Sequence, residues 1–146
     1  MTRQVSEIPD GYEFSSATDR MDRGLIHTWL SRDAYWALGR TRETQDAAIL
    51  GSRNFGAFRS SGEQVAYARV VTDGATFAWL CDVFVDPSER GSGIGAGLIK
   101  LICDELDRLD LKRIVLATGD AQEFYRRFGF EVLAAPEQWM SKLGVS

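Results

Sequence analysis

LCDVFVDPSERGSGIG, residues 80–95, is the most informative segment of this sequence. Its first half is an apolar run with strand character, which Pro87 stops because proline cannot continue a strand ladder. Glycines follow at 91, 93 and 95. Apolar residues then recur at helical spacing, at Ile94, Leu98, Ile99, Leu101, Ile102, Leu106 and Leu109. The stretch therefore predicts a strand, a glycine loop and a helix in direct succession.

The glycine loop has the properties of a phosphate-binding site. Alternating glycines let the backbone approach a ligand with no Cβ atoms in the way. The loop opens a helix, whose first N–H groups lack intrahelical partners and carry partial positive charge. Arg90 adds a permanent cation at the entrance. The construction predicts that the loop binds a phosphate or pyrophosphate group.

Several kinds of protein use such a loop. A P-loop needs Gly-Lys-Ser/Thr, and residues 96–98 (Ala-Gly-Leu) supply neither the lysine nor the hydroxyl, which excludes it. A dinucleotide fingerprint matches Gly91-x-Gly93-x-x-Ala96, with Asp120 after the next strand. That motif normally opens its domain, however, and only 26 residues follow Asp120. A glycine-rich turn without a ligand is the third alternative.

The rest of the chain alternates between strand and helix patterns. The expected strands cover Tyr12–Ser16, Asn54–Arg59, Gln64–Thr72, Thr76–Val85, Arg113–Ala117, Phe130–Leu133 and a last one around Trp139–Lys142. Besides the helix after the loop, helices are expected from Asp19 to near Tyr35 and Trp36, over Glu43–Leu50 and over Ala121–Phe128. This order predicts an α/β arrangement around a mixed sheet.

Bulk composition is that of an ordinary globular protein. The 146 residues are 45% hydrophobic and 26% charged, and the net charge of −4 argues against broad binding to nucleic acid or to an anionic membrane. Cys81 and Cys103 lie in apolar segments and are expected to be small buried hydrophobes rather than a disulfide. Met1–Asp10 has no apolar core of signal-peptide type, so a cytoplasmic location is expected.

Two blocks of the sequence resemble the GNAT superfamily of acetyl-CoA-dependent N-acetyltransferases. Arg90, Gly93 and Gly95 fill the family pattern Arg/Gln-x-x-Gly-x-Gly/Ala after a strand and a proline turn. Residues 121–130, AQEFYRRFGF, resemble the family's second block, A-x-x-hydrophobic-Tyr-x-x-x-Gly-Phe. The resemblance implies a GNAT fold of the α/β (α+β) class as one domain over residues 1–146. It implies a mixed, mostly antiparallel twisted sheet of six to seven strands flanked by about four helices.

The resemblance implies a binding mode for acetyl-CoA. It implies no metal ion in the site. The cofactor would lie in the splay between the Thr76–Val85 and Arg113–Ala117 strands, and Arg90 would shape the loop. The family often has Asn where this chain has Thr118, so the Thr118 hydroxyl or Asp120 would replace that contact. The main-chain contacts implied for the pantetheine are at Val83, Phe84 and Val85, and those for the pyrophosphate at Gly91, Ser92, Gly93, Ile94, Gly95 and Ala96.

For catalysis, the resemblance implies that Tyr125 is the general acid that protonates the departing thiolate. The alternative is a buried aromatic residue. The general base is less defined, because Trp79 stands where many members of the family carry Glu. Asp82 is the only acid within its strand. It would anchor the ammonium or relay its proton, or else be a carboxylate held by neighbouring backbone or arginine.

The acceptor side is the least patterned part of the chain. His27, the only histidine, lies on the first helix, which borders the acceptor site in the family, and Tyr35 and Trp36 would form an aromatic wall for a cation. Structural roles for all three are the alternative. Arg69 would face the groove or pair with an acid. The expected activity is acetyl transfer to a primary amine of a small molecule, or acetyl-CoA sensing without turnover. A homodimer remains open.

Overall fold

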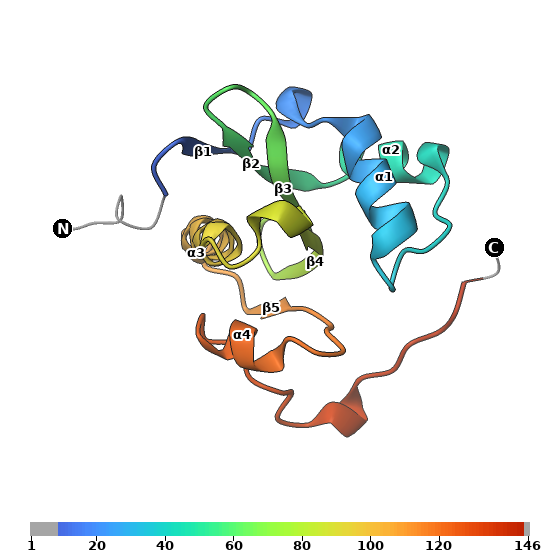
Figure 1. Ribbon diagram of the computed structural model, residues 1–146. Helices are drawn as coiled ribbons and strands as arrows, with labels where there is room; N and C mark the ends of the chain where they lie inside the picture. Colours follow the sequence, from blue (N-terminus) through green and yellow to red (C-terminus); the bar gives the residue numbers. More distant parts are fainter. Residues whose placement is uncertain (1–8, 145–146) are drawn as a thin grey trace.

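A computed structural model describes residues 9–144 and contains one five-stranded sheet in the order β1-β2-β3-β4-β5 (Figure 1). The strands are β1 (Tyr12–Ser15), β2 (Arg53–Arg59), β3 (Gln64–Thr72), β4 (Phe77–Val85) and β5 (Arg113–Val115). The α-helices are α1 (Arg23–Asp33), α2 (Arg42–Leu50), α3 (Ile94–Asp107) and α4 (Gln122–Arg126). Short 3-10 turns cover Thr18–Arg20, Pro87–Glu89 and Pro136–Gln138.

The pairing of β4 with its two neighbouring strands shapes the candidate site. Strands β1 to β4 are joined antiparallel, whereas β4 and β5 run parallel. The β4–β5 pairing ends at Trp79 opposite Val115, although β4 continues to Val85. On its other side β4 carries a bulge against β3, and Asp82 has a φ of 53° there. The second half of β4 therefore separates from β5, and the bulge re-aims its main chain.

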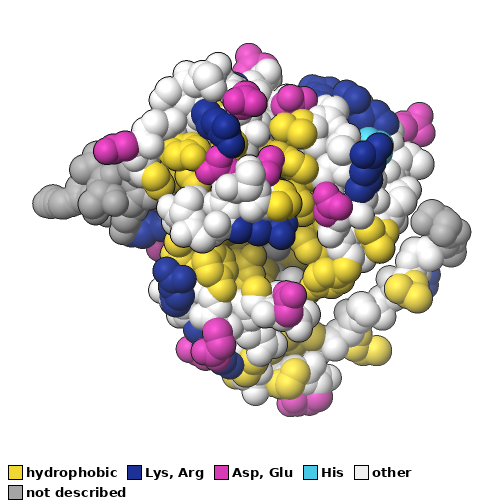
Figure 2. Space-filling view, in the orientation of Figure 1, with side chains coloured by type: hydrophobic (Ala, Val, Ile, Leu, Met, Phe, Trp, Pro, Cys, Tyr) yellow, Lys and Arg dark blue, Asp and Glu magenta, His cyan; other side chains and the backbone are white. Residues whose placement is uncertain are grey.

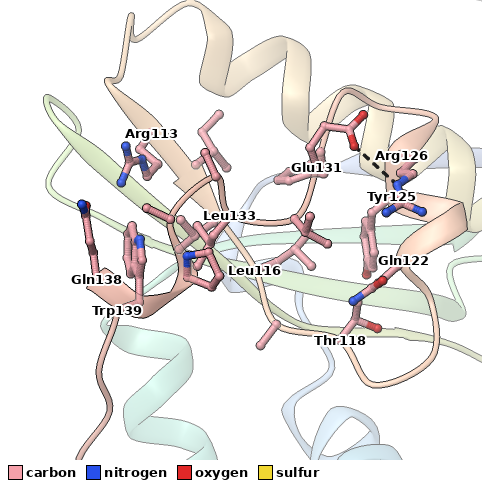
Figure 3. Close-up of a pocket in the computed structure, with 18 residues that line it drawn as sticks. Arg113, Leu116, Thr118, Gln122, Tyr125, Arg126, Glu131, Leu133, Gln138 and Trp139 are labelled. Atoms are coloured by element: carbon pink, nitrogen blue, oxygen red, sulfur yellow. Dashed lines mark ion pairs between the residues drawn. The ribbon is translucent and has the colours of Figure 1, made fainter.

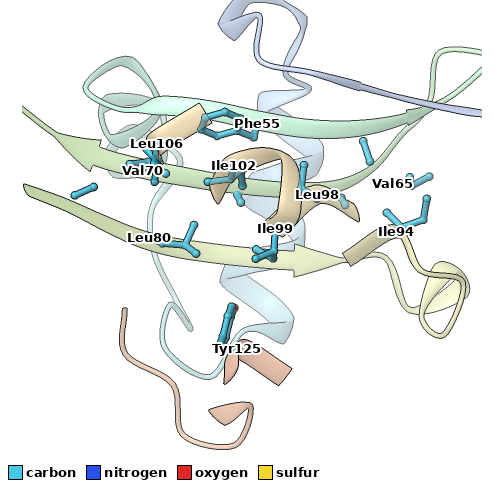
Figure 4. Packing of buried hydrophobic residues seen from close by; sticks show 14 residues of the cluster. Phe55, Val65, Val70, Leu80, Ile94, Leu98, Ile99, Ile102, Leu106 and Tyr125 are labelled. Carbon is cyan, nitrogen blue, oxygen red and sulfur yellow. The ribbon is translucent and has the colours of Figure 1, made fainter. Parts of the chain in front are cut away.

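Two hydrophobic cores lie on opposite faces of the sheet. The first packs α3 and Tyr125 of α4 against one face (Figure 4), and the second packs α1 and α2 against the other. The buried residues of α3 follow its apolar stripe: Ile94, Leu98, Ile99, Ile102 and Leu106. The pattern of residues 94–106 thus predicted both the helix and the face that it buries.

Side-chain caps set the starts of the two N-terminal helices. The Asp22 side chain accepts a hydrogen bond from the amide of Leu25, and the Thr41 side chain accepts one from the amide of Thr44. The expectation that α1 continues near Tyr35 and Trp36 is wrong, because α1 ends at Asp33. Tyr35 and Trp36 instead belong to the α1–α2 loop, where their polar atoms bond groups on other elements.

The C-terminal part departs most from the expected pattern. The segments Phe130–Leu133 and Trp139–Lys142 form no strands, so the sheet has five strands rather than six or seven. β5 ends at Val115, two residues before Ala117. A strand needs a hydrogen-bonded neighbour, and these segments find none among residues 9–144. No helix within the described range is long and apolar enough to cross a membrane.

Candidate active site

The glycine loop follows β4 and opens α3. Gly91 and Gly93 have φ values of 85° and 90°, a backbone conformation that favours glycine. The amide of Gly97 donates to the carbonyl of Gly93 at 3.0 Å. The amides of Ile94, Gly95 and Ala96 therefore precede the first intrahelical bond and have no carbonyl partner within the helix. A Cβ on Gly93 would meet no atom within 4 Å, so the loop borders open space.

Residues next to the glycines hold the loop in place. Arg90 donates from Nε to the carbonyl of Val85 at 3.0 Å, which connects its side chain to the end of β4. The buried Glu89 accepts a hydrogen bond from the Tyr12 hydroxyl at 2.5 Å and forms an ion pair with Arg59 of β2. The hydrogen bond to Glu89 raises the pKa of Tyr12. Sequence reasoning missed Glu89, because a buried acid looks like any other acid in sequence.

The end of β4 divides its side chains between the two cores. Phe84 is buried in the α1 core and stacks on Trp29 with ring centroids 5.5 Å apart. Val83 and Val85 pack against the α3 core. These side chains are structural, so binding by residues 83–85 would have to use main-chain atoms. The separation from β5 leaves that stretch of β4 without a neighbouring strand on one side.

Tyr125 lies where α4 faces this separation. Its side chain extends from α4 toward β4 and Ile99 (Figure 4), and it is 9% exposed. Burial, together with the nearby Tyr35 and Asp120, raises its pKa to about 12. The phenol is therefore protonated at neutral pH. Within residues 9–144 no hydrogen bond is found for its hydroxyl, which leaves that group available to a ligand.

The loop after β5 is fixed by short-range contacts. Thr118 accepts a hydrogen bond from the amide of Ala121 at 3.0 Å, so its hydroxyl closes a turn. Asp120 is exposed. The amide of Gly119 donates to the Tyr35 hydroxyl at 2.8 Å, which connects this loop to the α1–α2 loop. Tyr35 thus joins two loops on either side of the sheet edge.

Asp82 is the centre of a buried polar cluster. Its Oδ2 accepts from Arg40 Nη1 and from Arg69 Nε, each at 2.7 Å, and its Oδ1 accepts from Trp36 Nε1 at 2.8 Å. Burial by itself would raise the pKa of Asp82, but the hydrogen bonds from the two arginines outweigh it and hold the pKa below its usual range. Of the alternatives for Asp82, these contacts favour a carboxylate held by arginine. They also place Arg69 in a pair with an acid.

His27 has a local structural contact. Its Nε2 lies 2.8 Å from the carbonyl oxygen of Arg40, so it donates to that carbonyl and steadies the loop that carries Arg40. Trp36 packs edge-on against Tyr35 with centroids 5.0 Å apart, while both side chains stay largely exposed. The structure therefore brings Tyr35, Trp36 and Asp82 together, and His27 joins them only through Arg40. No pattern in the sequence indicated that Arg40 belongs to this cluster.

A shallow, mostly apolar groove lies over the paired part of β4 and β5, next to the turn between β3 and β4. It has a volume of about 430 Å³. Ala78 and Leu80 face the α3 core, so Trp79 points to the opposite face. Asp73 is the one charged residue of the lining, and its hydrogen bonds to Thr76 and neighbouring amides lower its pKa. The lining residues are Val71, Thr72, Asp73, Phe77, Trp79 and Val115.

The residues present fit acetyl-CoA as a ligand. Free amides at the start of α3 suit a pyrophosphate, and the unpaired stretch of β4 suits the extended pantetheine arm. Figure 2 shows hydrophobic side chains in the hollow between the part that carries the glycine loop and the part that carries α4. Among residues 9–144 no group of three or more His, Cys, Asp or Glu side chains is placed to hold a metal ion.

Comparison with known proteins identifies the family. The model of the acetyltransferase (GNAT) family matches residues 24–130, so the chain belongs to the GNAT family of acetyltransferases. A solved structure from Xanthomonas campestris, assigned to the same family, is 39% identical. The match has a TM-score of 0.88 and covers 94% of this chain and 95% of that one.

Curated relatives match over a shorter region. Histone acetyltransferase TAP1 of Glycine max is 40% identical over 74 residues, which is 50% of this chain and 31% of the relative. Serotonin N-acetyltransferase 2 of Oryza sativa is 36% identical over 72 residues, 49% of this chain and 36% of the relative. The match thus spans about a third of these relatives. Their names point to different acceptors.

Proposed function

We propose that this chain transfers the acetyl group of acetyl-CoA to a primary amine of a small molecule by direct attack in a ternary complex. The observation that carries the proposal is Tyr125, whose hydroxyl makes no hydrogen bond within residues 9–144 and whose ring lies beside the separation of β4 and β5. The glycine loop holds the pyrophosphate and the end of β4 lines the pantetheine. Thr118 and Asp120 border this channel.

Each group has one task in the transfer. The neutral amine attacks the thioester carbonyl carbon, a C–N bond forms, and the C–S bond breaks. A backbone N–H near the bulge, in Val83–Val85, donates to the carbonyl oxygen as negative charge develops there. Tyr125 gives its proton to the leaving thiolate, the ammonium that forms loses its proton to solvent, and solvent returns a proton to the Tyr125 phenolate. Asp82 orders the α1–α2 loop through Trp36 and Arg40 rather than accepting that proton.

The groove at Trp79 indicates which amines fit. Its walls are apolar apart from Thr72 and Asp73, and one end of it reaches Trp79 and Val115, the last β4–β5 pair, where the thioester would end. An amine with an apolar body would bury its carbon skeleton there and present nitrogen to the carbonyl. The rice relative is named for serotonin, a primary alkylamine that carries an aromatic ring, and this name is consistent with the acceptor class. The relative named for histones makes a lysine peptide the competing acceptor.

The experiment is thiol release from acetyl-CoA with phenylethylamine, butylamine and a lysine peptide. Tyr125→Phe should lower kcat by about 10²-fold or more while the Kd for CoA stays within twofold. Tyr67→Phe is the matched control, because its buried hydroxyl is already engaged in a hydrogen bond to Asn54. It should cost about 1 kcal/mol of stability and leave kcat unchanged. CoA binding without thiol release from any amine would instead establish a sensor.

A further inference from the structure

The polar cluster around Asp82 carries more positive than negative charge. Two guanidinium groups, those of Arg40 and Arg69, share this one carboxylate, which is their only ion-pair partner among residues 9–144. Two positive charges and one negative charge leave one positive charge unmatched. The side chains of Arg40 and Arg69 are only 18% and 12% exposed, so water solvates them poorly. Because a buried charge without a counter-ion is costly, the cluster favours an anionic ligand.

Neighbouring groups do not cancel the charge of Arg69. The other titratable groups that act on this arginine within residues 9–144 are Cys81 and Tyr67. Burial raises the pKa of both groups, so both are neutral at pH 7. Asp73, in the lining of the groove at Trp79, accepts hydrogen bonds from the amides of its own turn. The positive charge is therefore available to a ligand.

Both guanidinium groups also have unused N–H donors. A guanidinium carries five N–H donors. Arg40 donates two hydrogen bonds, to Asp82 and Gln45. Arg69 also donates two, to Asp82 and Ser52. The Nε2 atom of the fully buried Gln45 has no hydrogen-bond partner within residues 9–144. This surplus of donors suits a carboxylate, which accepts two parallel hydrogen bonds from a guanidinium.

The strand register connects this cluster to the groove at Trp79. The residues of β3 on either side of Arg69 belong to the α3 core, so Arg69 and Val71 point to the opposite face of the sheet. Val71 pairs with Trp79, and both line the groove. Arg69 pairs with Cys81, two residues farther along the same face. Two residues of a strand span about 7 Å. A small acceptor in the groove therefore reaches Arg69 with an anionic end.

The larger groove beside β5 differs in its charges. It has a volume of about 760 Å³ and lies between β5 with the residues after it and the segment 130–136 (Figure 3). Arg126 there pairs with Glu131, as the dashed line in Figure 3 shows. Arg113 packs over the ring of Trp139, 5.1 Å from its centroid. Both arginines are exposed, so water already solvates them. Of these two grooves, the one at Trp79 is therefore the one beside a buried, unmatched cation.

We infer that Arg40 and Arg69 form a carboxylate subsite, and that the acceptor is an amino acid with an apolar side chain. This inference rests on the proposed acetyl transfer. The carboxylate bonds the unused guanidinium N–H groups, the side chain lies over Trp79, and the amine faces the thioester. One unmatched positive charge suits a carboxylate, with its single negative charge, better than a phosphate group, which carries about −1.5 to −2 at pH 7.

The first test compares L-phenylalanine with phenylethylamine, which differ only in the carboxylate. After correction for the fraction of neutral amine, kcat/KM for thiol release should be at least about tenfold higher for phenylalanine. Arg69→Lys keeps a positive charge beside Asp82 but removes the planar fork, so it should lower that ratio about tenfold. Arg42→Lys, the matched control, changes an exposed partner of Asp46 and should leave the ratio unchanged. A purely structural Arg69 would lower both kcat/KM values together and keep their ratio.

The second test does not depend on turnover. 3-Phenylpropionate has the carboxylate and the ring but no amine, and 3-phenylpropanol is its neutral counterpart. In isothermal titration calorimetry, the wild type should bind the acid at least about tenfold more tightly than the alcohol, and Arg69→Lys should abolish most of this difference.

The two tests separate this inference from the proposed activity. Equal binding of the acid and the alcohol, or equal kcat/KM values for the two amines, would overturn the carboxylate subsite and leave acetyl transfer to phenylethylamine in place. Tighter binding of the acid, lost in Arg69→Lys, without thiol release from any amine would support the subsite and overturn the proposed transfer.

Discussion

Replacing Asp82 with asparagine separates a structural carboxylate from a catalytic one. The Asp82 side chain is 1% exposed and accepts two charge-assisted hydrogen bonds, from Arg40 and Arg69. Asn would keep the bond from Trp36 but turn a neutral amide toward two guanidinium groups. Breaking a buried pair in this way costs about 3–5 kcal/mol. The arginines keep some exposure, which favours the lower end of that range.

The measurement is urea unfolding of Asp82→Asn beside the wild type. We expect a loss of about 3 kcal/mol in the free energy of unfolding. In a thermal unfolding experiment, a loss of this size lowers Tm by roughly 6–12 °C for a domain of this size. Asp104→Asn is the matched control, because Asp104 forms a partly exposed i,i+4 pair with Lys100. It should change stability by less than about 0.5 kcal/mol. The difference at Asp82 thus measures burial and pairing rather than the loss of one negative charge.

The pH dependence has a defined sign. Because the pKa of Asp82 is lower in the folded state, its contribution is present above the unfolded pKa of about 3.9 and is lost as pH falls through the folded value. The gap in stability between wild type and Asp82→Asn should therefore narrow below about pH 4. An Asp82→Asn variant that is as stable as the wild type, has a kcat lower by about 10²-fold and lacks the acidic limb of the pH–rate profile would refute this reasoning. That result would make Asp82 the general base.

The remaining predictions concern the loop and the thiols. Gly93→Ala should lower the free energy of unfolding by about 1–2 kcal/mol, since φ is 90° there, and should raise KM for acetyl-CoA. Gly62→Ala, at φ 105° in the β2–β3 turn, should lower stability alone. Equal KM values for the two variants would count against acetyl-CoA binding by the loop. Glu89→Gln should weaken CoA binding, which isothermal titration calorimetry would measure. An unchanged affinity for CoA would contradict the role of Glu89 in holding the loop. Burial raises the pKa of Cys81 and Cys103 to about 11 each, so iodoacetamide at pH 7.5 should modify both about 100-fold more slowly than free cysteine and leave activity intact.

The structure confirms the parts of the sequence reading that rest on local pattern. The glycine loop, the α3 stripe and the five strands of the sheet depend on spacing and turn chemistry within a few residues. Asp82 shows where this reasoning stops. Its two arginines lie 42 and 13 residues away in sequence, and no local pattern connects them. The same holds for Tyr35, whose partner Gly119 is 84 residues distant.

The short, ordered motifs in residues 80–95 and 121–130 were enough to predict the family and the glycine loop from the sequence. The folded structure was needed to show where β4 separates from β5, how Asp82 is paired, and that two strand-like C-terminal segments have no strand partner within residues 9–144. The reason is physical. Helices and turns satisfy their backbone bonds locally, whereas strand pairing and buried charge depend on groups that only the folded chain brings together.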